Sequence, residues 1–200
     1  MGAPRQVLFI QGGGESTHDA WDHRLVASLR AELGDGVDVR YPRMPDEDDP
    51  SVARWVPAIR AEVASLDDGA VVVGHSIGGT LLIHALTEAA PDRRLSAIVL
   101  LAAPFVGDGG WPADEVEFTS DLGTRLPRDV PVHVFHGLDD AEVPPQHADL
   151  YRLAIPEAHV HGLPGRDHQF GDDLGPVASV IRGIGPPRSG WNQHEEEIDA

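Results

Sequence analysis

Residues 70–79, Ala-Val-Val-Val-Gly-His-Ser-Ile-Gly-Gly, join a short apolar run to a helical pattern with almost no loop between them. A continuous apolar run of this kind is typical of a strand that is buried on both faces of a parallel sheet. A strand that turns directly into a helix forces the turn residue, Ser76, into a strained backbone conformation, and side chains two positions to either side would clash. Gly74 and Gly78 stand at those two positions. The sequence therefore predicts a G-x-S-x-G turn that projects the Ser76 hydroxyl from the edge of a sheet, near the positive end of a helix dipole.

The same alternation of apolar runs and helical patterns extends along most of the chain. Repeated strand–helix alternation implies an open, mostly parallel α/β sheet that is flanked by helices and has right-handed crossovers. We expect six strands, at residues 6–10, 37–41, 70–74, 97–101, 132–136 and 158–161. We expect helices at residues 18–33, 51–66, 77–90, 145–153 and 173–181. The segment 104–128, which is rich in Gly, Pro and Asp, interrupts the pattern and is expected to be a wide loop or a short helical excursion.

The length of 200 residues suits one domain and is too short for two ordinary ones. We assign residues 1–182 to a single α/β domain, and residues 183–200, where Gly, Pro and Ser precede an acidic run, to a flexible C-terminal tail. The first apolar run leads straight into glycines, which is typical of a buried first strand and not of a signal peptide. We therefore expect a cytoplasmic protein.

Two residue types are missing from the sequence, and their absence limits its chemistry. There is no cysteine, and all fifteen Lys and Arg residues are arginine. Thiol nucleophiles, cysteine-ligated zinc, Schiff-base chemistry and Ser–Lys hydrolysis are therefore excluded. The formal net charge of −18 argues against nucleic acid and acidic membranes as partners, because both require a basic surface.

The turn around Ser76, with a strand before it and a helix after it, resembles the nucleophile elbow of the α/β-hydrolases. Over residues 5–182 the chain is similar to the small lidless serine hydrolases of the retinoblastoma-binding-protein-9 and YdeN type. That resemblance implies a single-domain α/β-hydrolase fold with little or no lid, in which a serine is followed along the chain by an acid and then by a histidine. The alternative is an ordinary glycine-rich turn that cradles a phosphate.

The resemblance also assigns an acid and a base. Residues 132–144 are similar to the family's acid loop, in which Asp-x-x-Val-Pro follows a strand, and this places the acid at Asp140. The adjacent Asp139 is the alternative acid, and a solvated turn is the alternative role for both. Residues 163–170, Leu-Pro-Gly-Arg-Asp-His-Gln-Phe, resemble the histidine loop and imply His168 as the base. We interpret the neighbouring Asp167 as a loop residue.

Two backbone N–H groups are expected to bind the oxyanion that acyl transfer develops. One belongs to Ile77, which follows the nucleophile at the start of a helix. By resemblance the other belongs to Gly13, in the loop after the first strand, where Gln11 replaces the histidine that is common in the family. The alternative roles for this loop are a flexible glycine-rich turn and a phosphate cradle, and the missing P-loop lysine argues against the cradle. The candidate apolar lining residues of an open, shallow pocket are Trp21, Phe105, Trp111 and Phe118.

Together these residues predict that Ser76, His168 and Asp140 hydrolyse small carboxylic esters or thioesters through an acyl-enzyme intermediate. The expected partner is a small-molecule acyl substrate, with no metal and no organic cofactor. Acyl transfer or amide hydrolysis by the same triad is the alternative among enzymes, because fold and triad do not fix the substrate. A non-catalytic binding protein that retains the fold is the alternative from another class. His159 and His161 share one strand face, but no third metal ligand is evident, and the oligomeric state is not predicted.

Overall fold

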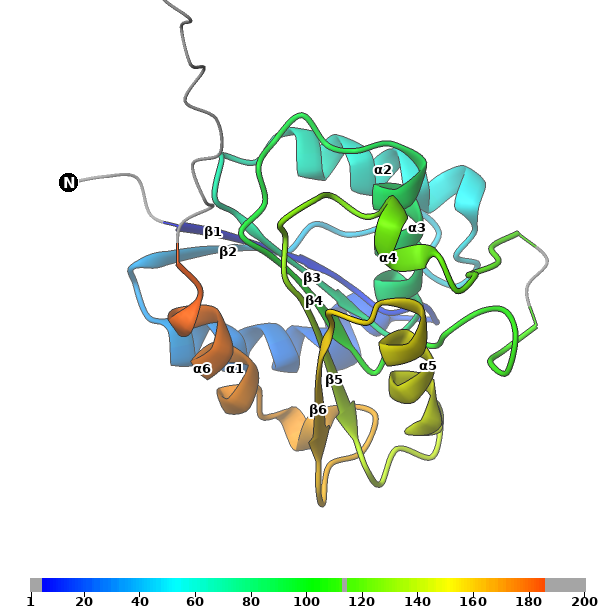
Figure 1. Ribbon diagram of the computed structural model, residues 1–200. Coiled ribbons are helices and arrows are strands. Elements are labelled where there is room, and N and C mark those ends of the chain that lie inside the picture. The colour runs from blue at the N-terminus through cyan, green and yellow to red at the C-terminus, as the bar shows by residue number, and fades with distance from the viewer. Residues whose placement is uncertain (1–4, 113–114, 186–200) are drawn as a thin grey trace, which may run out of the picture.

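The computed structural model describes residues 5–112 and 115–185. At its centre lies a six-stranded sheet in the order β2-β1-β3-β4-β5-β6, in which every neighbouring pair is parallel. Figure 1 shows the sheet running through the molecule between two groups of helices. The strands are β1 (Arg5–Ile10), β2 (Val37–Arg40), β3 (Val71–His75), β4 (Ala97–Leu101), β5 (Val132–Gly137) and β6 (His159–Leu163). The predicted single-domain, six-stranded parallel sheet is confirmed.

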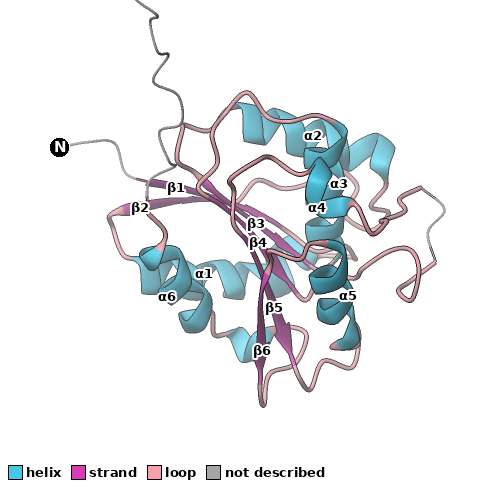
Figure 2. Cartoon of the chain, in the orientation of Figure 1, coloured by secondary structure: helices cyan, strands magenta, loops and turns pink. Residues whose placement is uncertain are grey.

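Helices cover both faces of this sheet (Figure 2). Helices α1 and α6 lie on one face, and α2, α3 and α5 lie on the other. The helical segments are a π-helical turn (Thr17–Asp22), α1 (His23–Leu33), α2 (Val52–Ala64), α3 (Ile77–Glu88), α4 (Leu122–Arg125), α5 (Gln146–Ala154), a 3-10 turn (Phe170–Asp172) and α6 (Gly175–Gly183). Within residues 5–112 and 115–185, no helix has the length and apolarity to cross a membrane.

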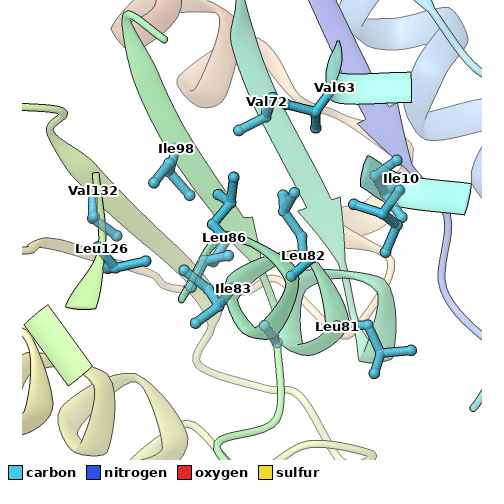
Figure 3. Close-up of a cluster of buried hydrophobic side chains, with 14 of the residues drawn as sticks. Ile10, Val63, Val72, Leu81, Leu82, Ile83, Leu86, Ile98, Leu126 and Val132 are labelled. Atoms are coloured by element: carbon cyan, nitrogen blue, oxygen red, sulfur yellow. The ribbon is translucent and has the colours of Figure 1, made fainter. Parts of the chain in front are cut away.

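The continuous apolar runs of the central strands are explained by this two-sided cover. Successive side chains of a strand point to opposite faces, so a strand with helices on both sides must be apolar throughout. Val72 and Ile98 belong to the core under α2, α3 and α5, whereas Val71 and Val99 belong to the core under α1 and α6. Figure 3 shows side chains of α3, Leu82 among them, gathered against the first of these faces.

The expected helix over residues 18–33 is in fact two segments. The chain first forms the π-helical turn at Thr17–Asp22 and continues as an α-helix only from His23. Asp22, at the junction, is fully buried. π-helical turns are rare in proteins, and those that occur often lie at functional sites. An apolar spacing of four residues does not distinguish such a turn from an α-helix, so the sequence pattern did not reveal it.

The structure describes most of the irregular segment 104–128 and only the start of the predicted C-terminal tail, residues 183–200. Between β4 and β5 the described residues contain only the short helix α4, so no lid domain covers the sheet there. At the C-terminus, α6 extends to Gly183, Ile184 packs against the core, and Arg5 donates a hydrogen bond to the carbonyl of Gly185. The rest of the predicted tail, residues 186–200, lies outside the described residues.

Glycines allow a very close backbone approach where β3 turns into α3. A Cβ atom on Gly74 would lie 2.5 Å from the Cα of Gly79, and a Cβ atom on Gly78 would lie 2.0 Å from the carbonyl oxygen of Gln11. Neither distance is possible between non-bonded atoms, so both positions require glycine, as the sequence predicts. The approach fixes α3 against the loop that follows β1.

We expect Gly78→Ala to lower the free energy of unfolding by about 1–3 kcal/mol, because the new methyl group overpacks against the backbone at Gln11. Gly183→Ala is the matched control, since Gly183 is also helical but has open space around its Cα. That variant should be neutral or more stable by up to about 1 kcal/mol, because alanine is the better helix former. Urea unfolding of both variants measures the difference, and equal stabilities would contradict the close approach.

Candidate active site

Ser76 lies between the last residue of β3 and the first residue of α3, with φ 50° and ψ −133°. A positive φ is uncommon for a residue with a side chain, and such strain concentrates at functional sites. The backbone around Ser76 is held on both sides, since its N–H donates to the carbonyl of Leu101 and its own carbonyl accepts from the N–H of Gly79. The predicted strained turn is therefore present, and Ser76 lines a cleft of about 490 Å³.

The loops that follow β5 and β6 bring an aspartate and a histidine together. Nδ1 of His168 lies 2.8 Å from Oδ2 of Asp140, and both side chains are buried. A carboxylate only accepts hydrogen bonds, so Nδ1 carries a proton, and in the neutral form of this ring Nε2 holds the free lone pair. His168 lines the same cleft as Ser76. Within the described chain no hydrogen bond joins the Ser76 hydroxyl to His168; in apo structures such bonds are often long and tighten only with substrate.

Asp140 is held as a carboxylate by several donors. Its Oδ1 accepts hydrogen bonds of 2.9 Å from the N–H groups of Glu142 and Val143. Burial raises the pKa of the Asp140 carboxyl, but hydrogen bonds from His136, His168 and the backbone outweigh it and hold that pKa far below its usual range. The group therefore stays ionised at neutral pH and keeps the Nδ1–H form of His168.

The structure separates Asp140 from the neighbouring Asp139. Asp139 is exposed on the wall of the cleft, and its N–H donates to the carbonyl of Arg166. Only Asp140 contacts the imidazole of His168 among the two. The geometry thus favours Asp140 over Asp139 as the acid, a choice that the sequence left open.

A second histidine on Asp140 was not predicted from the sequence. His136, at the end of β5, is buried, and its Nε2 lies 2.8 Å from the carbonyl oxygen of Val143 and 3.3 Å from Oδ2 of Asp140. A carbonyl oxygen only accepts, so Nε2 of His136 carries a proton that also faces the carboxylate. Its place in an apolar strand pattern gave no signal of this contact.

The two residues predicted to supply the oxyanion donors, Gly13 and Ile77, are neighbours in the fold. A Cβ atom on Gly13 would come within 2.9 Å of Cγ2 of Ile77, so the loop and the start of α3 are in direct contact. In the described part of the chain, the N–H groups of Gly13 and Ile77 donate to no other protein group. The flanking N–H groups are occupied: that of Gly12 donates to Asp22 at 2.7 Å, and that of Gly14 donates to a backbone carbonyl.

Gln11 takes over the bracing of this loop. Its side chain is fully buried, its Oε1 accepts from the N–H of Met44 at 3.0 Å, and its Nε2 donates to the carboxylate of Glu47 at 2.6 Å. Glu47 in turn accepts from the N–H of His18 through its side chain and from the N–H of Gly14 through its carbonyl. The uncommon glutamine therefore ties the glycine-rich loop to residues 44–47.

A second Asp–His pair lies directly behind the first. Nδ1 of His75 is 3.0 Å from Oδ2 of Asp22, and Nε2 of His75 is 3.1 Å from the carbonyl oxygen of His168. Both partners can only accept, so satisfying both bonds requires a proton on each ring nitrogen. Burial lowers the pKa of His75, but the charge and hydrogen bond of Asp22 and the carbonyl of His168 outweigh it and raise that pKa. The pair ties the backbone of His168 to the turn that carries Asp22.

The predicted aromatic lining needs correction. Trp21 lines the cleft and is 51% exposed. Phe105 and Phe118 are instead buried, stacked edge-on with each other and packed around Tyr151. Trp111 packs edge-on against His147 and lies outside the cleft. The segment after β4 folds back on itself through backbone hydrogen bonds, and its aromatic side chains pack toward α5 and away from the cleft.

The other notable histidines lie at the edge of the sheet. His133 of β5 stacks on His159 and His161 of β6, and its Nδ1 lies 3.2 Å from Nε2 of His161. Over residues 5–112 and 115–185, no three His, Asp or Glu side chains are arranged to hold a metal ion.

The parallel sheet, the strained serine turn and the ordered acid and histidine loops define an α/β-hydrolase. The chain belongs to the Serine hydrolase family, whose model matches residues 7–162. Comparison with curated proteins gives no significant match.

Three solved structures illustrate the likeness. The ydeN gene product from B. subtilis is 20% identical with a TM-score of 0.70, over 90% of this chain and 97% of that one. The esterase RhEst1 from Rhodococcus sp. ECU1013 is 18% identical with a TM-score of 0.68, over 92% of each chain. SOBER1 from Arabidopsis thaliana is 18% identical with a TM-score of 0.67, over 90% of this chain and 99% of that one. At these identities the likeness establishes the fold.

We expect Asp22→Asn to cost about 3–5 kcal/mol of stability at pH 7, because it leaves the buried His75 without its counter-charge. Since the folded-state pKa of His75 is raised, its protonation stabilises the wild type below about pH 6.5, and this contribution is lost as the pH rises through the raised pKa. In the Asp22→Asn variant the pH-dependent stabilisation by protonated His75 is lost, because burial then disfavours the charged imidazole with no carboxylate to offset it. Urea unfolding against pH measures the loss, and nitrogen NMR of the imidazole should show two protonated nitrogens in the wild type at pH 7.

The matched control is Asp172→Asn, which removes a carboxylate from an exposed pair with Arg24. It should cost no more than about 1 kcal/mol. Equal losses in the two variants, or a neutral His75 in the wild type at pH 7, would contradict a charged pair.

Proposed function

We propose that this serine hydrolase cleaves carboxylic esters or thioesters, with Ser76 as the nucleophile, His168 as the general base and Asp140 as the carboxylate that orients the base. The 2.8 Å hydrogen bond between His168 Nδ1 and Asp140, at a cleft that Ser76 also lines, is the observation that carries the proposal. That RhEst1, a solved structure with this fold, is an esterase supports an ester substrate.

In the proposed reaction, Nε2 of His168 takes the proton from Ser76 as its oxygen attacks the acyl carbon. The N–H groups of Gly13 and Ile77 bind the oxyanion, with help from the positive end of α3. His168 then gives the proton to the leaving group. A water molecule, deprotonated by the same imidazole, releases the acyl group from Ser76. Asp140 stays ionised throughout, in keeping with its lowered pKa.

The cleft supports small substrates. Its 490 Å³ suits a compact acyl group, and between β4 and β5 the described residues provide no lid that would enclose a long chain. Acyl transfer and amide hydrolysis would use the same three side chains, and they differ from ester hydrolysis only in the acceptor or the leaving group.

We expect a fluorophosphonate probe to label the wild type and to leave Ser76→Ala unlabelled, because the probe reacts only with an activated serine. Intact-protein mass spectrometry with peptide mapping measures the label. An unlabelled wild type would favour a non-catalytic protein, and equal labelling of the variant would move the nucleophile to another residue.

We expect Asp140→Asn to lower kcat/KM for a neutral aryl ester by about 10³–10⁴-fold, because the amide no longer fixes the imidazole tautomer. Asp139→Asn is the matched control: it makes the same chemical change one residue away on an exposed side chain. Its effect on the same ester should stay within about twofold. Steady-state kinetics decides between the two, and the reverse order would assign the acid to Asp139.

A further inference from the structure

The exposed charged side chains on the walls of the cleft are all of one sign. Four exposed carboxylates line it, those of Glu15, Asp139, Glu142 and Asp167. No arginine is among the residues that line the cleft, and the chain contains no lysine. The cleft that holds Ser76 is therefore acidic in its own lining, in addition to the general acidity of the protein.

These carboxylates are not neutralised by neighbouring cations. In the described chain none of the four forms an ion pair with arginine. Glu142 approaches only Nε2 of His168, at 4.0 Å, and Asp167 accepts a hydrogen bond from the N–H of Gly171. Their negative charge is therefore available to a molecule that enters the cleft.

Two arginines beside residues that line the cleft are engaged elsewhere. Arg24 packs over the ring of Trp21 and pairs with Asp172 at 3.1 Å. Arg166 pairs with Asp173. The two histidines that line the cleft, His75 and His168, do not offset the charge of the four carboxylates, because each is paired with a buried aspartate. Electrostatic focusing in such a cleft concentrates cations and repels anions.

We propose that the four carboxylates make the site select small acyl substrates that are positively charged or neutral, with the cation preferred, and reject anionic acyl donors. The inference rests on the proposed function. It also limits which thioesters could be substrates, because a thioester formed with a phosphate-bearing carrier is a polyanion and would be rejected. Four carboxylates at roughly 8 Å from a substrate charge in water should together favour a cation over its uncharged isostere by about tenfold at low ionic strength.

The experiment uses three phosphonyl thioester probes that differ only in the leaving group: a trimethylammonioethyl thiolate, its uncharged tert-butylethyl isostere and a sulfonatoethyl thiolate. In each reaction the Ser76 oxygen forms a bond to phosphorus, the phosphorus–sulfur bond breaks, and His168 takes the serine proton as the thiolate leaves. Dividing each second-order inactivation rate by the probe's rate with hydroxide removes differences in intrinsic reactivity.

We expect the order cation, neutral, anion, with about tenfold between the first two at about 10 mM salt and about twofold at about 500 mM salt. The double variant Asp139→Asn/Glu142→Gln removes two of the four charges and should reduce the preference to about threefold at low salt. The control Asp35→Asn/Glu157→Gln makes the same charge change on exposed residues that precede β2 and β6. These residues lie at the amino ends of the strands, whereas the cleft lies at the carboxyl ends. It should retain the tenfold preference.

Equal normalised rates for the cationic and neutral probes, or the same reduction in the control variant, would overturn charge selection by the cleft and leave the serine hydrolase assignment intact. Failure of all three probes to modify Ser76 would instead overturn the proposed function.

Discussion

The backbone contact between the start of α3 and the ends of β1 and β3 determines the rest of this structure. Because a Cβ on Gly78 would lie 2.0 Å from the carbonyl of Gln11, no side chain separates the helix from the loop. Further along the same loop, Gly13 lies against the side chain of Ile77, the residue that follows Ser76. Ser76 is left with a positive φ, which its own backbone hydrogen bonds to Leu101 and Gly79 maintain.

The parallel sheet collects the remaining groups. The carboxyl ends of parallel strands lie at one edge, where ligands bind in open α/β sheets. Gly137, the last residue of β5, lets the acid loop touch the histidine loop, since a Cβ there would lie 2.3 Å from the carbonyl of Arg166. The N–H of Asp139 donates to that same carbonyl. Asp140 and His168, 28 residues apart, are thereby held at hydrogen-bond distance.

Local patterns in the sequence were sufficient for the strands along the chain and for the glycine turn at Ser76, whereas the loops that carry Asp140 and His168 were assigned from the family resemblance. They were not sufficient for contacts between distant residues, such as Asp22 with His75, which are 53 positions apart. Nor does an aromatic side chain in an irregular segment show which way it will point: Phe105 turned into the core because the segment folds back toward α5. Periodicity reports burial on a regular element, and outside such elements it reports nothing.

The two Asp–His pairs show how the partner of the second ring nitrogen decides what a histidine does. His168 and His75 each bond a buried aspartate through Nδ1. Nε2 of His75 faces a carbonyl oxygen, which only accepts, so both ring nitrogens of His75 are engaged within the protein and the ring serves as a structural tie. His168 lines the cleft, where the proposed reaction uses its Nε2 as the general base. The tie is made to the carbonyl of His168 itself, so the imidazole of His75 positions the residue whose own imidazole faces the cleft.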